Sequence, residues 1–297
     1  MLARPECVAC IYRTRAAELA ASRLPEDVKV AKLRALTEHY ALLVAPGVAT
    51  TVLAWRAFAK VKELLGEEDP YREFKEESRR VAESLARKVR SAAEGKVGLE
   101  RLRYLIRASV AANYLDPGSP MGLEPGDLLR AIEAVRFGRD ETGRLYGQLL
   151  ASRAVAYVLD NSGEAVFDAL VMEELRRMGL ELSIVARGKP YQNDVTYEEA
   201  LQMGLDRLGT LISSGTDFPG VVPGFVSSEA VEALRRADVV ISKGMANFES
   251  FLLSQPPKPT FIVLTAKCLP IAAAAGVRPG EAAAFFLGGA PGPRDLL

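Results

Sequence analysis

The chain has 297 residues, of which 49% are hydrophobic and 26% are charged, with 38 basic and 38 acidic side chains. This composition excludes extended disorder and collagen-like repeats, and the balanced charge argues against a protein that wraps nucleic acid. No apolar run reaches the roughly 18–20 residues that a membrane helix needs, and the N-terminus lacks the apolar centre of a signal peptide. We therefore expect a cytoplasmic protein that binds neither nucleic acid nor membrane.

The first half of the chain is predicted to be helical. Apolar residues recur at three- and four-residue spacing, as in the series Phe74, Val81, Leu85 and Val89. Similar patterns predict helices over 13–23, 27–43, 48–64, 70–95, 99–110, 124–136 and 140–151. No segment before residue 150 has the pattern of a strand, so residues 1–150 are expected to form a helical domain.

The second half has a different pattern. Short apolar runs alternate with helical stretches and end in Gly, Ser, Asn or Asp; they cover 154–160, 180–186, 208–214, 238–244 and 260–266. Fully apolar strands separated by helices indicate a mostly parallel sheet with helices on both faces, and 282–288 is expected to be a last edge strand. Residues 151–297 are thus predicted to form a Rossmann-like, doubly wound α/β domain, whose ligands would bind beyond the carboxyl ends of the strands.

Polar residues with metal-binding chemistry follow the first two of these runs. Asp160 and Asn161 offer a carboxylate and an amide oxygen, hard ligands suited to Mg²⁺ or Mn²⁺, although they are equally good helix caps. Asp194 would supply a second carboxylate if the two strands are neighbours. Thr196 and Glu199 have the spacing of a capping box, which would leave Asp194 free for the cation.

The third and fourth runs end in residues that suit an anion. Ser214, Gly215 and Thr216 can expose backbone N–H groups, although a plain turn is the simpler interpretation. Lys243, followed by a glycine and a predicted helix, resembles a phosphate-binding arrangement but lacks the spacing of a Walker A loop. A carboxylate–amide pair, a second carboxylate and a lysine on one sheet edge together match the needs of phosphoryl transfer.

The amide residues are few. The chain has four asparagines, at 113, 161, 193 and 247, and four glutamines. Depletion of thermolabile amides is typical of proteins that work at high temperature, so the retained asparagines are candidates for functional roles.

These segments together resemble the damage-control phosphatase family. The similarity rests on DNSGE (160–164), RGKPYQNDVT (187–196), SSGTDFPG (213–220), ADVVISKGMANFES (237–250) and TAKC (265–268), in the family's order and spacing. AANYLDPG (111–118) is similar to the family's Gly-Asn-x-x-Asp segment, and CVAC (7–10) to the CxxC of its archaeal branch. Ala246 stands where relatives usually have glycine, and Ala111-Ala112 precede Asn113 without the usual glycine.

The resemblance implies a metal-dependent phosphatase of small phosphorylated metabolites, such as sugar phosphates or phosphopantetheine compounds, with a helical N-terminal domain and a Rossmann-like C-terminal one. It places the metal ligands on Asp160, Asn161 and Asp194, and we assign Lys243 to the phosphate. The candidate substrate-binding residues are Asn113, Asp116, Ser162, Glu164, Ser214, Gly215, Thr216 and Asn247. The cation would be Mg²⁺, Mn²⁺, Co²⁺ or Ni²⁺, and the substrate would lie in an interdomain cleft.

The cysteines and the single histidine allow several interpretations. Cys7 and Cys10, with Cys268 and His39, would give zinc an acceptable ligand set, but a reducible Cys7–Cys10 pair or packed thiols fit the sequence better. With one histidine, a histidine-based mechanism is not expected.

Two other functions remain open at this point. One is an S-adenosylmethionine-dependent carboxyl methyltransferase on the same kind of sheet, although its cofactor usually needs a more glycine-rich first loop. The other is a non-catalytic sugar-phosphate-binding protein. The sequence predicts no oligomeric state.

Overall fold

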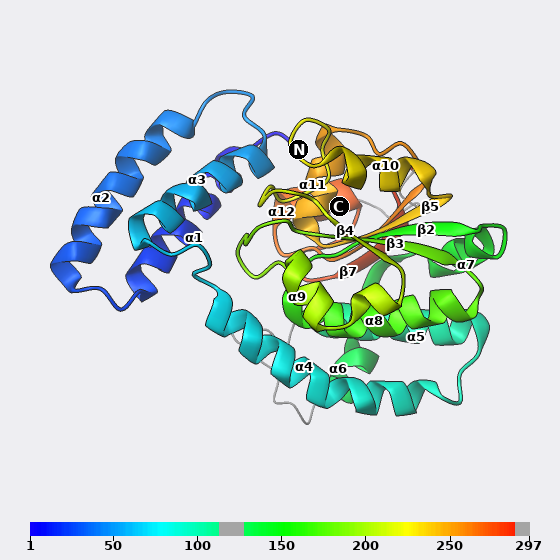
Figure 1. Ribbon diagram of the computed structural model, residues 1–297. Helices are drawn as coiled ribbons and strands as arrows, with labels where there is room; N and C mark the ends of the chain where they lie inside the picture. Colours follow the sequence, from blue (N-terminus) through cyan, green and yellow to red (C-terminus); the bar gives the residue numbers. More distant parts are fainter. Residues whose placement is uncertain (113–127, 289–297) are drawn as a thin grey trace.

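The structure is a computed structural model that describes residues 1–112 and 128–288 (Figure 1). Its first half is mainly helical, as predicted. The helices are α1 (Pro5–Ala21), α2 (Glu26–Leu43), α3 (Thr50–Leu65), α4 (Arg72–Ala93), α5 (Gly98–Ala111), α6 (Leu128–Ala134) and α7 (Thr142–Leu150). Helices α1 to α3 pack on one another and form a unit at one side of the molecule (Figure 1).

The second half contains most of a seven-stranded sheet. Its strands are β1 (Phe137–Asp140), β2 (Ala154–Val158), β3 (Glu181–Ala186), β4 (Thr210–Ser213), β5 (Val239–Lys243), β6 (Thr260–Thr265) and β7 (Ala282–Phe286). Their order in the sheet is β1-β7-β6-β5-β2-β3-β4, and all pairs are parallel except β6–β7. The predicted mostly parallel α/β architecture is confirmed.

Helices cover both faces of the sheet. The remaining helices are α8 (Ser162–Arg177), α9 (Tyr197–Gln202), the 3-10 turn η3 (Leu205–Arg207), α10 (Ser228–Arg236), α11 (Met245–Leu253) and α12 (Leu269–Ala275). Helices α5 and α8 lie on one face with α4 outside them, and α10, α11 and α12 lie on the other (Figure 1). Val155 and Tyr157 of β2 join the first core and Ala156 and Val158 the second, because successive strand residues point to opposite faces.

Two details differ from the sequence prediction. Residues 137–140 form a strand, β1, although no strand was expected before residue 150, and β1 rather than β7 occupies that edge of the sheet. The short sequence Phe-Gly-Arg-Asp has no strand pattern; its backbone is placed by pairing with β7. A domain boundary at residue 150 stays a prediction. In the structure α5 and β1 pack with the sheet, and α4 packs on α8 and α5.

The order of the strands decides where a ligand site can form. β2 lies between β5 and β3, and the chain moves from β2 outward in one direction through β3 and β4 and in the other direction through β5 and β6. This reversal is the switch point at which open α/β sheets bind ligands. Among the described residues, no helix is both long and apolar enough to cross a membrane.

Candidate active site

The loops that follow β2 and β3 are joined through their backbones. The Val195 amide donates to the Asp160 carbonyl (2.8 Å), and the Ser162 amide donates to the Asn193 carbonyl (2.9 Å). Asn161 and Asp194 pair as an isolated antiparallel bridge. The structure therefore brings together the three residues predicted to hold a cation.

Asp160 is a buried carboxylate with no hydrogen-bond donor in the described part of the chain. Its residue is 8% exposed, and no hydrogen bond or ion pair joins its side chain to any residue in 1–112 or 128–288. Burial, together with the neighbouring charges of Asp194 and Glu164, raises the pKa of Asp160 well above its ordinary value. Such a carboxylate is costly unless a cation binds it.

Gly244 makes room for this carboxylate at the end of β5. Its φ of +78° suits glycine, and a Cβ at this position would lie 2.0 Å from Oδ2 of Asp160. The carboxylate thus packs directly against the backbone at the point where β5 leads into α11.

Asp194 is held by Arg187 from the end of β3. Nε of Arg187 donates to Oδ2 of Asp194 (2.7 Å), and the same guanidinium donates to Oδ1 of Asn247 (3.1 Å). Burial raises the pKa of Asp194, and Arg187 opposes the shift. Asn247 is fully buried and donates to the Leu159 and Lys243 carbonyls (3.0 and 2.8 Å), so it ties the ends of β2 and β5 to Arg187.

Lys243 is enclosed in a second buried network. Its Nζ contacts Oγ of Ser109 (2.5 Å), Oε2 of Glu164 (2.8 Å) and Oδ1 of Asp168 (3.1 Å). Tyr157 and Ser109 donate to Oδ1 of Asp168 (2.7 and 2.6 Å). Burial alone would lower the pKa of Lys243, but Asp168 and Glu164 outweigh it and raise that pKa above its ordinary value.

The two networks together carry an excess of negative charge. Four buried carboxylates, on Asp160, Glu164, Asp168 and Asp194, face two buried cationic side chains, on Lys243 and Arg187. The nearby Lys75 already forms ion pairs with Asp69 and Glu199, at 2.8 Å each, so it does not balance the charge of this cluster. Two negative charges therefore lack a counter-charge, which is the deficit that one divalent cation would fill.

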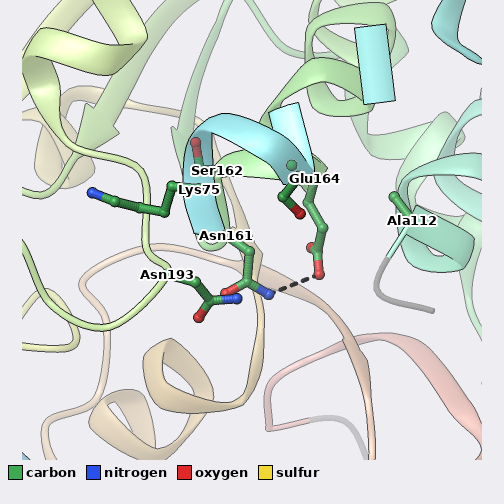
Figure 2. Close-up of a pocket in the computed structure, with 8 residues that line it drawn as sticks. Lys75, Ala112, Asn161, Ser162, Glu164 and Asn193 are labelled. Carbon is green, nitrogen blue, oxygen red and sulfur yellow. Dashed lines mark hydrogen bonds between the residues drawn. The ribbon is translucent and has the colours of Figure 1, made fainter. Parts of the chain in front are cut away.

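A small pocket opens beside this cluster. It is lined by α4, by Ala112 at the end of α5, and by Asn161, Ser162, Glu164 and Asn193 (Figure 2). Nδ2 of Asn161 donates to Oε1 of Glu164 (3.0 Å), as the dashed line in Figure 2 marks. Oγ of Ser162 is buried and has no hydrogen-bond partner within the described residues, which leaves it available to a ligand.

The loop after β4 is tied to the loop after β3. The Gly188 amide donates to Oγ of Ser214 and to the Thr216 carbonyl (3.0 Å each), and Ser214 Oγ donates to that same carbonyl (3.0 Å). A Cβ on Gly188 would lie 2.5 Å from the backbone of Gly215 and Thr216. These groups hold the two loops together, and their contact with a phosphate stays a prediction.

The α1–α3 unit packs against the loop that carries Asp194. Tyr191 is buried among Leu19, Leu36, Phe58 and Val61, with its ring 5.3 Å from that of Phe58. The next residue, Gln192, has a φ of +46°, an uncommon conformation for a side chain of its size.

Side chains of α3 also make polar contacts with this loop and with the loop after β4. Lys62 donates to the Pro190 carbonyl (3.3 Å) and to Asp217 (2.7 Å), and Trp55 Nε1 also donates to Asp217 (2.6 Å). The helical unit therefore contributes to the site by fixing its loops.

Several predicted residues take other places. Asn113 and Asp116 lie outside the described residues. Lys243 and Asn247 are buried with their polar atoms engaged by protein groups, so the structure does not present them to a phosphate or a substrate. Thr196 and Glu199 do form the predicted capping box, at the start of α9.

The cysteines do not assemble a metal site in the described part of the chain. There, no three His, Cys, Asp or Glu side chains are gathered so as to hold a metal, and Cys7, Cys10 and Cys268 are free thiols. The candidate cation site differs in kind, because its third ligand is the Asn161 amide. His39 is half-buried on α2, with no role in the site.

Sequence reasoning missed four residues that shape the site: Ser109, Tyr157, Asp168 and Arg187. Arg187 directly follows β3, so its place at the sheet edge was a usable signal. Ser109 lies in an otherwise apolar stretch of α5, and nothing in the sequence indicates that it meets a lysine 134 positions away.

Comparisons with known proteins show the family to which the chain belongs. The profile of the damage-control phosphatase ARMT1-like domain matches residues 3–283. The chain is 31% identical to the damage-control phosphatase PH1575 of Pyrococcus horikoshii, over 90% of this chain and 92% of the relative. It is 33% identical to a damage-control phosphatase of Archaeoglobus fulgidus, over 77% and 80% of the two chains.

The fold gives the same result. The crystal structure of a DUF89 family protein, PH1575 from Pyrococcus horikoshii, superposes with a TM-score of 0.87 at 26% identity, covering 96% of this chain and 99% of the other. An uncharacterized protein of Methanocaldococcus jannaschii, MJ0202, is 29% identical over 94% of this chain and 93% of its own. On this profile match, these identities and this fold, the chain belongs to the damage-control phosphatase family, in its ARMT1-like group.

Proposed function

We propose that this protein is a divalent-metal-dependent phosphatase that hydrolyses a small phosphorylated metabolite, either a sugar phosphate or a phosphopantetheine-like phosphomonoester. The observation that carries the proposal is the buried Asp160 beside Asp194. Within the described residues Asp160 has no hydrogen-bond donor, and its cluster has two uncompensated negative charges. Family membership supports phosphatase chemistry, and the switch-point location supports a ligand site at this edge of the sheet.

The residues present fit a hard divalent cation. Asp160, Asn161 and Asp194 offer two carboxylates and one amide oxygen, the ligand types that Mg²⁺ and Mn²⁺ prefer. Bound there, such a cation would supply Lewis-acid stabilisation of phosphoryl oxygens.

The chain's own residues would prepare this site in three ways. Arg187 holds one oxygen of Asp194, and Asn247 holds Arg187, so the second carboxylate is fixed before a ligand arrives. Gly244 lets the Asp160 carboxylate sit against the backbone. Ser162 lines the pocket, and its hydroxyl has no hydrogen-bond partner among the described residues, so it could donate to a substrate oxygen.

A phosphate-release assay tests the proposal. The protein, first stripped with a chelator, is given sugar phosphates and phosphopantetheine with Mg²⁺, Mn²⁺, Co²⁺ or Ni²⁺ in turn. We expect hydrolysis that requires a cation and that Asp160→Ala abolishes, while Asp206→Ala, at an exposed position, leaves it unchanged. Full activity of Asp160→Ala, or metal-free binding of S-adenosylmethionine in calorimetry, would count against it.

A further inference from the structure

Glu164 faces Asn161 with an atom that can only accept hydrogen bonds. An ionised carboxylate has no donor, so the Asn161 carboxamide must turn its NH₂ group toward Glu164, as the 3.0 Å contact from Nδ2 to Oε1 shows (Figure 2). The carboxamide is planar, so its oxygen then points away from Glu164. Of the two ends of this amide, only the oxygen can bind a cation.

Glu164 is itself held in place by an ion pair with Lys243. Its second oxygen, Oε2, accepts from Lys243 at 2.8 Å, and both side chains are 2% exposed. The carboxylate therefore joins two fixed donors: the lysine on one side and the amide on the other.

Lys243 has no donor left for a phosphate. An ammonium group carries three N–H donors, and three acceptors surround it, on Ser109, Glu164 and Asp168. Releasing Glu164 or Asp168 to free a donor would break a buried ion pair, which is strongly destabilising.

We propose that Lys243 and Glu164 are positioning residues that set the orientation of the Asn161 carboxamide, so that its oxygen and not its nitrogen faces the bound cation. The proposal rests on the cation site proposed above and assigns Lys243 a role different from the phosphate contact predicted from sequence. Lys243 acts on the cation through two successive hydrogen bonds, without touching it or the substrate.

Reversing the polarity of the Asn161–Glu164 pair tests this role. In Glu164→Gln, the introduced side chain has one oxygen, whereas Lys243 and Asn161 both donate to Glu164 in the wild type. If that oxygen accepts from Lys243, the introduced NH₂ group faces Asn161. The Asn161 carboxamide must then flip and turn its own NH₂ group toward the cation. In Asn161→Asp/Glu164→Gln, the carboxylate and the amide are exchanged. The introduced glutamine then gives its oxygen to Lys243 and its NH₂ to the introduced aspartate, whose second oxygen stays free for the cation, and the total charge is unchanged.

The measurement is calorimetric titration of the chelator-stripped protein with MnCl₂, with thermal unfolding as a second readout. We expect Glu164→Gln to bind Mn²⁺ about 10-fold or more weakly, as for other residues behind metal ligands, and the double variant to recover to within about 3-fold of the wild type. Glu174→Gln is the matched control, since it changes a buried, arginine-paired glutamate on the same helix and should bind like the wild type.

Each outcome decides between explanations. Wild-type affinity in Glu164→Gln overturns the proposal. A folded double variant that binds as weakly as the single one also overturns it, because restoring an oxygen toward the cation, with the total charge kept, would then not restore binding. The double variant keeps the test decisive even if Glu164→Gln does not fold. A wild-type protein that binds no Mn²⁺ refutes the cation site itself, a result distinct from either of these.

Discussion

Replacing Asp160 by asparagine should have opposite effects on stability with and without metal. The substitution keeps the shape of the side chain and removes its charge. Without metal, the wild type holds Asp160 buried beside Asp194 and Glu164, with no donor from residues 1–112 or 128–288. Leaving a buried polar group unsatisfied costs about 1–3 kcal/mol, and more when the group is charged. We therefore expect metal-free Asp160→Asn to be more stable than the wild type by at least about 1 kcal/mol.

With metal, the order should reverse. A ligand present at 100 times its dissociation constant adds about 2.7 kcal/mol to the free energy of unfolding. The wild type should gain this amount from Mn²⁺, whereas Asp160→Asn, which lacks a main ligand, should gain almost nothing. The assay is urea unfolding of both proteins in chelator and in saturating Mn²⁺.

The crossing of the two stabilities identifies a metal ligand. If the residue had a purely structural role, the substitution would lower the free energy of unfolding in both conditions. If the residue were not involved, the free energy of unfolding would change in neither. If metal-free Asp160→Asn is less stable than the wild type and still gains stability from Mn²⁺, the assignment of Asp160 to the cation is wrong.

Two further substitutions test other parts of the site, and a third, on α11, tests a buried glutamate outside it. Arg187→Lys keeps the charge but loses the guanidinium that contacts Asp194 and Asn247 at the same time, so we expect about 10-fold weaker Mn²⁺ binding in calorimetry. Gly244→Ala should displace Asp160 and force a left-handed alanine, so that denaturant unfolding shows a loss of at least about 1 kcal/mol together with loss of metal binding. Glu249→Gln tests pH dependence: burial raises the pKa of this side chain from 4.5 to about 7, so the folded wild type should lose stability as pH rises from about 4.5 through 7. The free energy of unfolding of the variant should match that of the wild type in acid and exceed it above pH 7 by at most about 3 kcal/mol. If the free energy of unfolding changes equally with pH in both proteins, this expectation is wrong.

The sequence predicted the sheet well, because each central strand is an apolar run that ends in a turn residue. The convergence of Asp160 and Asp194 followed from the same reasoning, since the carboxyl ends of parallel neighbours share one edge of the sheet. Strand β1 escaped prediction because Phe137–Asp140 has no pattern of its own and depends on pairing with β7.

The position of Lys243 could be predicted from the sequence, but the contacts of its side chain could not. The pattern placed it at the correct edge of the sheet, next to a glycine that begins a helix. Whether a lysine there meets solvent or a carboxylate depends on the helix that covers it. Here α8 brings Glu164 and Asp168 and α5 brings Ser109 over its ammonium group, and this packing is not visible in any local pattern.

The buried networks suggest why so many charges surround one small site. A cation bound only by flexible carboxylates would have to order them first, and fixing each side chain carries an entropic cost. Arg187 holds Asp194, Glu164 orients Asn161, and the backbone of Gly244 packs against Asp160, so each proposed ligand is fixed by another group of the protein. The cost of this arrangement is two unbalanced buried charges in the metal-free protein. Affinity for the cation and instability in its absence should therefore arise from the same residues, and substitutions that relieve one should weaken the other.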